Sequence, residues 1–181
     1  MAVLVEAISV IVKGTAIEDR FPGGFEAFRD DVPNATLCAD GDIARVGFMT
    51  PDDVGEYIEY LESAGLQFLV DGEAVDFVVA DQQRGFTTAC NWAEVGRTSI
   101  DGDAQHIITA CQAVDTKTEE LICPLGWQYE GSLSQTYTFV PTEHVERSAE
   151  LLRDEDGLEV YRSALTGNEM YVGRTSTKHG K

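Results

Sequence analysis

The order of apolar runs and helix signals in residues 1–80 constrains the fold most strongly. Residues 3–12 form a run rich in Val and Ile, which is typical of a strand buried on both faces. Thr15, followed three residues later by Glu18, predicts a helix that begins with a capping box. Residues 25–31 predict a second, short helix. The chain therefore begins with a buried strand followed by helical structure.

A hairpin and a longer helix are expected next. Asp40-Gly41 separates two apolar runs, residues 36–39 and 43–49, and this dipeptide is typical of a tight turn between strands. Thr50-Pro51 predicts the N-cap and the first residue of a helix, because Thr caps well and Pro tolerates the first helical position. We expect this helix to end at Gly65.

Two further strands, residues 66–70 and 74–80, complete the order strand, helix, strand, strand, helix, strand. This is the order of a split-βαβ, ferredoxin-like unit. We therefore predict an α+β fold: an antiparallel sheet with a split-βαβ N-terminal half and helices on one face, then a strand-rich C-terminal half. In that second half we expect strands at residues 90–97, 106–114, 119–123 and 133–140, a helix over 142–153, and a hairpin of 158–161 with 169–172.

No stretch has the composition of a linker, so we expect one compact domain over residues 1–181, with possible subdomains 1–100 and 101–181. The four cysteines form no C-x-x-C pair and are interpreted as buried thiols of a reducing compartment. Residues 1–12 lack the basic start of a secretory signal, and no run approaches the roughly 20 apolar residues of a membrane helix. These features predict a cytoplasmic protein.

Acidic residues outnumber basic ones 32 to 13, which gives a formal charge of −19. This balance argues against binding to nucleic acid or to an anionic membrane, because both need clustered Lys and Arg. Evenly spread carboxylates are typical of a solvated surface. The alternative is an acidic face that binds a basic protein partner, as an immunity or inhibitor protein does. A further alternative is a homodimer in which the terminal hairpins of two chains pair.

One polar segment is a candidate ligand site. Asp81-Gln82-Gln83-Arg84-Gly85 follows an apolar strand, and Asn91-Trp92 comes shortly after it. Amide and guanidinium groups bind small polar or anionic ligands, and an indole supplies a flat wall. The candidate ligand-binding residues are Asp81, Gln83, Arg84, Asn91 and Trp92. The alternative is a polar loop with one surface arginine. A second aromatic pair, Trp127 and Tyr129, would line a ligand surface or cap the core.

Asp101, Asp103 and His106 form the one metal-like cluster, because two carboxylates and an imidazole within six residues can bind a divalent cation. The alternative is a turn, since Asp-Gly-Asp is common turn chemistry. The sequence contains no nucleophile elbow, phosphate-binding loop or dinucleotide motif. We therefore expect no cofactor and no catalysis, with a metal-dependent enzyme using these three residues as the alternative.

Several strings resemble those of an uncharacterised family of bacterial cytoplasmic proteins: Phe21-Pro22-Gly23-Gly24-Phe25, Val46-Gly47-Phe48-Met49-Thr50-Pro51, Asp81-Gln82-Gln83-Arg84-Gly85 and Leu158-Glu159-Val160-Tyr161. The resemblance implies a bacterial cytoplasmic origin and no particular activity. Taken with the residues above, it leads us to expect a non-catalytic module that binds a small ligand or regulates a partner. An acidic protein-interaction protein and a metal-dependent enzyme remain the alternatives.

Overall fold

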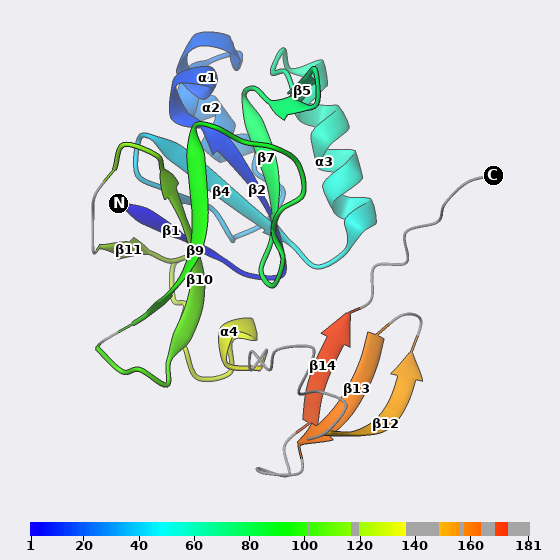
Figure 1. Ribbon diagram of the computed structural model, residues 1–181. Coiled ribbons are helices and arrows are strands. Elements are labelled where there is room, and N and C mark those ends of the chain that lie inside the picture. Colours follow the sequence, from blue (N-terminus) through cyan, green and yellow to red (C-terminus); the bar gives the residue numbers. More distant parts are fainter. Residues whose placement is uncertain (101, 117–119, 137–148, 156–157, 164–168, 174–181) are drawn as a thin grey trace, which may run out of the picture. The chain divides into compact units, whose positions relative to one another are not determined.

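The computed structural model describes residues 1–100, 102–116, 120–136, 149–155, 158–163 and 169–173 (Figure 1). The chain divides into two compact units, residues 1–128 and 129–181, and each is described by itself. The predicted α+β class is confirmed, because the described residues contain four helices together with mostly antiparallel strands. None of the helices among these residues is long and apolar enough to cross a membrane.

The first unit is built on a five-stranded sheet in the order β3-β4-β2-β7-β8, with every neighbouring pair antiparallel. β2 lies between β4 and β7, and its six residues pair with β4 along their whole length. The ferredoxin-like assignment stays a prediction, because β8 adds a fifth strand and a second sheet covers the face opposite the helices. The strands are β2 Ile8–Lys13, β3 Cys38–Ala39, β4 Ile43–Phe48, β7 Phe77–Asp81 and β8 Gly85–Phe86.

Three helices lie on one face of this sheet, as expected (Figure 1). They are α1 Gly14–Arg20, α2 Gly24–Asp31 and α3 Pro51–Ser63. Val10 and Val12 of β2 point toward them and share a buried cluster with Phe28 and Leu61. Burial of such side chains contributes about 1.5–3 kcal/mol each. This cluster fixes the helices on the sheet.

A second sheet, in the order β11-β1-β10-β9, covers the other face. Ile11 of β2 and Val78 of β7 pack there against Val3 and Cys111 of the second sheet. β2 is therefore buried on both faces, which explains its uninterrupted Val and Ile content. The strands are β1 Ala2–Val5, β9 Ala93–Ser99, β10 Ile107–Ala113 and β11 Leu121–Ile122.

The single strand predicted over residues 3–12 is wrong. The chain turns at Glu6-Ala7, where Ala7 has a φ of 48°, and residues 2–5 and 8–13 enter different sheets. Both segments are buried on two faces, so the apolar pattern is continuous across the turn. Hydropathy alone therefore gave no sign of the break.

The helix signals differ in outcome. The predicted capping box of Thr15 and Glu18 is wrong, because α1 begins at Gly14 and its N-cap, Lys13, makes no side-chain cap bond. The N–H of Gly14 instead donates to the carbonyl of Asp42 at 2.7 Å. The predicted start of α3 is confirmed, since the Thr50 hydroxyl accepts a hydrogen bond from the N–H of Asp53.

A two-stranded ribbon connects α3 to β7. The strand predicted over residues 66–70 is shorter than expected, because only β5 Leu69–Val70 is extended and it pairs with β6 Glu73–Ala74. The strand predicted over residues 74–80 is divided in the same way, between β6 and β7. The chain bends at residues 75–76 between the two strands, and the carboxylate of Asp76 accepts a hydrogen bond there from the N–H of Gln67.

The second unit contains α4 Leu133–Thr136 and a three-stranded antiparallel sheet of β12 Ala149–Glu155, β13 Leu158–Ser163 and β14 Glu169–Gly173. The predicted terminal hairpin is confirmed. The strand predicted from residue 133 is wrong over 133–136, because the Ser132 hydroxyl accepts the N–H of Gln135 and starts a helix. The helix predicted over 142–153 is wrong over 149–153, which pair with β13. Residues 137–148 lie outside the described residues.

Residues 102–128 continue the first unit rather than opening a new one. β10 pairs with β9 over seven residues, so this hairpin spans the position near residue 100 where the sequence suggests a subdomain boundary. The division between units instead follows Gln128. A single domain over residues 1–181 stays a prediction.

Candidate functional site

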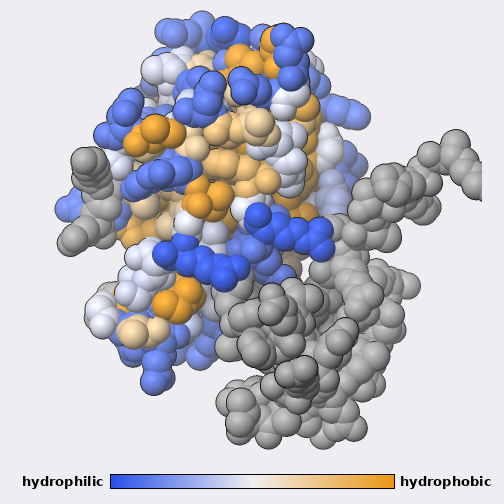
Figure 2. Space-filling model, in the orientation of Figure 1, coloured by the Kyte–Doolittle hydropathy of each residue, from blue (hydrophilic) through white to orange (hydrophobic). Residues whose placement is uncertain are grey.

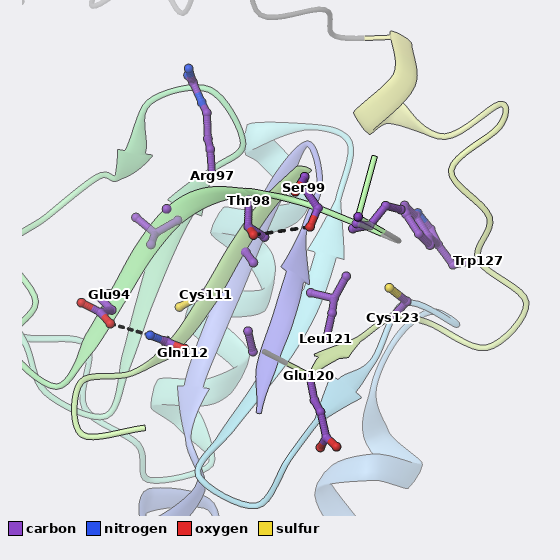
Figure 3. Close-up of a pocket in the computed structure, with 16 residues that line it drawn as sticks. Glu94, Arg97, Thr98, Ser99, Cys111, Gln112, Glu120, Leu121, Cys123 and Trp127 are labelled. Carbon is purple, nitrogen blue, oxygen red and sulfur yellow. Dashed lines mark hydrogen bonds between the residues drawn. The ribbon is translucent and has the colours of Figure 1, made fainter. Parts of the chain in front are cut away.

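A pocket of about 850 Å³ lies against the second sheet, within the first unit (Figure 3). Its lining comes mainly from β9 and β10, with residues of β1, β11 and the segment up to Trp127. Figure 2 shows hydrophilic side chains around the first unit and apolar ones gathered in the middle of the face in view. Both hydrophilic and apolar residues line the pocket. We call it the outer-face pocket.

Strand register builds its floor from small residues. Gly96 of β9 pairs with Ala110 of β10, which in turn pairs with Leu4 of β1. Alternate residues such as Val95 and Cys111 turn the other way and pack between the two sheets. A glycine beside an alanine leaves the backbone open to close approach by a ligand.

A carboxylate and an amide stand next to this floor. Glu94 and Gln112 are cross-strand partners, and the Gln112 Nε2 donates to the Glu94 Oε1 at 2.6 Å. The bond is visible at one end of the pocket in Figure 3. It orients the amide so that its carbonyl oxygen and the second carboxylate oxygen act as acceptors.

The indole of Trp127 lies at the opposite end of the pocket (Figure 3). Its Nε1 donates to the Glu6 carboxylate at 3.0 Å, and its backbone N–H donates to the carbonyl of Pro124 at 3.0 Å. Both bonds fix the ring. Trp127 is one of the two aromatic residues predicted to line a ligand surface or cap the core, and the other, Tyr129, belongs to the second unit.

Arg97 lines the outer-face pocket, but its guanidinium points away from it (Figure 3). The Nη2 donates to the carbonyl of Gln83 at 3.2 Å, and burial lowers the pKa of this guanidinium. The other charged residues among the described lining are Glu94 and Glu120. The Glu120 side chain also points away from the other side chains drawn (Figure 3), so the charged group of the described lining that borders the pocket is Glu94, beside neutral polar and apolar residues.

The structure does not bring the five sequence-predicted ligand residues together. The Asp81 carboxylate accepts the N–H groups of Gln83 and Arg84, which forms a turn with Arg84 exposed. Asn91 and Trp92 instead line a second pocket of about 540 Å³. None of the five lines the outer-face pocket.

Chain direction explains this separation. Asp81 pairs with Ile8 at one end of β2, whereas Trp92 lies beside Lys13 at the other end, with the Lys13 Nζ 4.9 Å from the ring centre. The Trp92 indole donates to the carbonyl of Ala74 at 3.0 Å. After β8 the chain runs back along β7, so residues close in sequence reach opposite ends of the sheet.

The metal-like cluster falls in the turn between β9 and β10. The Asp103 Oδ2 lies 3.7 Å from the Nε2 of His106, and the Asp103 side chain also accepts a hydrogen bond from the N–H of Gln105. Asp101 lies outside the described residues. In the part of the chain that is described, no group of three or more metal-ligating side chains gathers. The turn interpretation accounts for Asp103 and His106 as they stand.

Two of the four cysteines, Cys38 and Cys111, are poor candidates for nucleophiles. All four are free thiols, and Cys38 and Cys111 are buried. Burial raises the pKa of Cys38, although Arg45 beside it opposes part of that effect, and burial raises the pKa of Cys111 well above its usual range. Both therefore remain protonated thiols at neutral pH.

Comparisons with family models, with curated proteins and with solved structures found no match. The fold and the site thus define a class by geometry alone: an α+β chain whose first unit carries a pocket on the outer face of its second sheet. The resemblance to an uncharacterised bacterial family stays a prediction.

Proposed function

We propose that the first unit is a non-catalytic module that binds a small molecule in the outer-face pocket. The observation that carries the proposal is the pocket itself, whose volume of about 850 Å³ suits a ligand of metabolite size. Its small-residue floor, fixed indole and oriented amide supply shape and a few directed polar groups. Such a combination is typical of ligand sites.

The lining supports binding rather than turnover. The Glu94 carboxylate is bonded to an amide and not to a nucleophile or a histidine. The Cys111 thiol belongs to the core between the sheets. A nucleophile within reach of a base is the usual signature of covalent catalysis, and this pair of contacts does not supply it.

Gly96 offers a clean way to test the pocket. A Cβ added at this position meets no heavy atom within 4 Å, so Gly96→Val fills the floor without a clash. Valine also favours a strand, which keeps β9 intact. Gly55→Ala on α3 is the matched control, because that position is equally open and α3 lies on the other side of the five-stranded sheet.

The experiment is a thermal-shift screen of a metabolite library, followed by calorimetry of each hit with the three proteins. A ligand at about 100 times its Kd stabilises the folded state by about 2.7 kcal/mol. We expect at least one hit whose binding persists in Gly55→Ala and disappears in Gly96→Val. A set of hits that all bind Gly96→Val unchanged would refute the outer-face pocket as the site.

We also propose a cytoplasmic location. Four free thiols among the described residues support it, because thiols persist in a reducing compartment.

A further inference from the structure

We infer that the β9 edge, the side of β9 turned away from β10, is a dimer interface. At this interface the β9 strands of two copies of the chain pair antiparallel, with Gly96 opposite the partner's Gly96. The inference is independent of the proposed function, because it concerns the edge of the second sheet and not a ligand. It also differs from a homodimer formed through the terminal hairpin.

The β9 edge is long, whereas the other sheet edges described in the first unit are short. In the order β11-β1-β10-β9, β9 is the last strand, and it has seven residues. The other edge strands of the two sheets, β3, β8 and β11, have two residues each. A short edge strand protects a sheet from pairing with another chain, and a long one favours such pairing.

Hydrogen bonds within the hairpin show which backbone groups point outward. The N–H of Ile100 donates to the carbonyl of His106, and the N–H of Val114 donates to the carbonyl of Trp92. Because bonded residues alternate along an antiparallel ladder, the odd-numbered residues of β9 turn their N–H and C=O groups away from β10. Among the described residues, the N–H groups of Val95 and Ser99 have no acceptor.

The β9 edge lacks common protective features. Its sequence contains neither Pro nor Lys, and its pairing with β10 has no bulge. Residues 96–99 are exposed. The Val95 side chain faces Gly85 in the space between the two sheets, so β8 lies beneath β9 and not beside it.

Charge favours a second copy at this edge. Two chains that each carry a formal charge of −19 repel one another, so they approach most easily through a surface without net charge. β9 contains one Glu and one Arg, and β10 contains no charged residue. α1, α2 and α3 instead carry many more acidic than basic residues. A basic partner would gain more at those helices than at β9.

The sequence of β9 is compatible with pairing to itself about a two-fold axis. Gly96 lies at its centre, and a Cβ added there meets no heavy atom within 4 Å, so two strands can approach closely at this point. With Gly96 on the axis, Glu94 lies opposite the partner's Thr98. This register brings no like charges opposite each other, which cross-strand pairing would penalise.

The experiment is sedimentation equilibrium of the full chain over a range of protein concentrations. Gly96→Lys places two ammonium groups opposite each other on the two-fold axis, and we expect it to weaken the dimer roughly 10-fold or more. Gly55→Lys is the matched control, because Gly55 is equally open on α3 and the net charge changes by the same amount. It should dimerise at least as well as the wild type.

Ser99 allows a test of the backbone itself. Ser99→Pro removes an N–H that points away from β10, and Pro is tolerated at such positions of edge strands. Each copy loses one hydrogen bond between the strands, so we expect a dimer that is roughly 10-fold weaker. Ser99→Ala removes the same hydroxyl but keeps the N–H, and it should dimerise like the wild type. The melting temperature of each variant shows that it is folded.

Hydrogen exchange locates the interface. We expect amide exchange in residues 93–99 of the wild type to slow as the protein concentration rises. A wild type that stays monomeric at millimolar concentration would overturn the inference. So would a Gly96→Lys dimer as tight as that of Gly55→Lys, or concentration-dependent protection in residues 158–173 instead of 93–99. The last result would assign the dimer to the terminal hairpin.

Discussion

The guanidinium of Arg45 meets the hydroxyl of Ser9 between the two sheets of the first unit, where Nε donates to Oγ at 2.9 Å. The Nη1 donates to the carbonyl of Thr36 at 3.1 Å and the Nη2 to the carbonyl of Glu6 at 3.0 Å. Arg45 is only 3% exposed and Ser9 is fully buried. One cation thus joins β4 to the turn between β1 and β2 and to the chain before β3.

We expect Arg45→Met to lower the free energy of unfolding by about 3 kcal/mol, because it removes three buried or half-buried hydrogen bonds, to Ser9, Thr36 and Glu6. Arg45→Lys should also destabilise, since an ammonium cannot reproduce the planar fork. Urea denaturation measures both. Arg29→Met is the control, because Arg29 is exposed on α2 and should change stability by at most about 0.5 kcal/mol. An Arg45→Met protein as stable as this control would contradict the expectation.

Asp76 and Arg20 form an ion pair in which the carboxylate is buried and the guanidinium is half-exposed. The Asp76 Oδ2 accepts from the Arg20 Nη1 at 2.9 Å and from the backbone N–H of Gln67 at 2.8 Å. The Asp76 side chain is 5% exposed, whereas that of Arg20 is 47% exposed. Solvent screens such a half-exposed pair strongly.

We therefore predict that Asp76→Ala lowers the free energy of unfolding by about 2–3 kcal/mol, because it leaves the N–H of Gln67 without an acceptor and also breaks the ion pair with Arg20. Arg20→Ala should cost less than about 1 kcal/mol. Chemical denaturation of the two variants and of the double variant tests the order. Equal losses from the two single variants would show that the ion pair, rather than the bond to Gln67, carries the stability.

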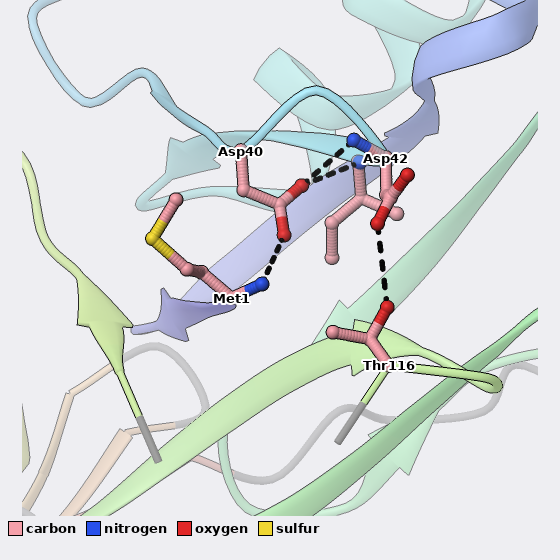
Figure 4. A network of polar contacts seen from close by, with 5 residues as sticks. Met1, Asp40, Asp42 and Thr116 are labelled. Carbon is pink, nitrogen blue, oxygen red and sulfur yellow. Dashed lines mark hydrogen bonds and ion pairs between the residues drawn. The ribbon is translucent and has the colours of Figure 1, made fainter. Parts of the chain in front are cut away.

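Asp40 makes stability depend on pH. Burial alone would raise the pKa of Asp40, but the Met1 amine at 2.8 Å and the N–H groups of Ile43 and Asp42 outweigh it and lower the pKa (Figure 4). Because the folded-state pKa lies below the unfolded one, this carboxylate stabilises the fold above the unfolded pKa. The contribution disappears as the pH falls through the folded-state pKa.

We expect wild type to exceed Asp40→Asn in unfolding free energy at pH 7, and the difference to shrink as the solution is acidified below the ordinary pKa of an aspartate. Urea denaturation of both proteins across that pH range measures this difference. The effects of the other carboxylates are the same in both proteins and cancel in the difference. A gap between the two proteins that stays constant with pH would mean that Asp40 acts through shape and not through charge.

Local signals predicted one helix start and missed another. Thr50, Pro51 and Gly65 predicted α3, because its capping bond forms between neighbours along the chain. The capping box predicted from Thr15 and Glu18 is wrong, because the N–H of Gly14 at the start of α1 bonds to the carbonyl of Asp42. The break between β1 and β2 could not be predicted, because it depends on which sheet each segment joins. The register in which neighbouring strands pair could not be predicted from the sequence either.

Part of the candidate site could likewise be predicted from the sequence and part could not. Trp127 was recognisable as an aromatic residue flanked by glycines. Glu94 and Gln112 were not, because they are 18 residues apart and only the pairing of β9 with β10 brings them together. The five residues that were predicted instead are close in sequence, yet the chain carries them to opposite ends of β2. Proximity in sequence is thus a poor guide where a strand reverses direction.

Substitution by alanine should raise the free energy of unfolding at Gly55 and lower it at Gly14. Gly55 is exposed within α3, and a Cβ there meets nothing within 4 Å. Gly55→Ala should stabilise the protein by about 0.5–1 kcal/mol, because alanine restricts the unfolded chain and favours a helix. Gly14 begins α1 directly against the turn before β4, where an added Cβ would lie 2.0 Å from the carbonyl oxygen of Gly41.

Gly14→Ala must therefore displace backbone that cannot rotate away, and we expect it to lose more than about 3 kcal/mol, at the severe end for single substitutions. Thermal and urea denaturation of both variants measure the two signs, and circular dichroism shows whether Gly14→Ala still folds. A Gly14→Ala protein as stable as wild type would mean that α1 can shift away from the turn. The contact between Gly14 and Gly41 would then not be what positions α1 on the sheet.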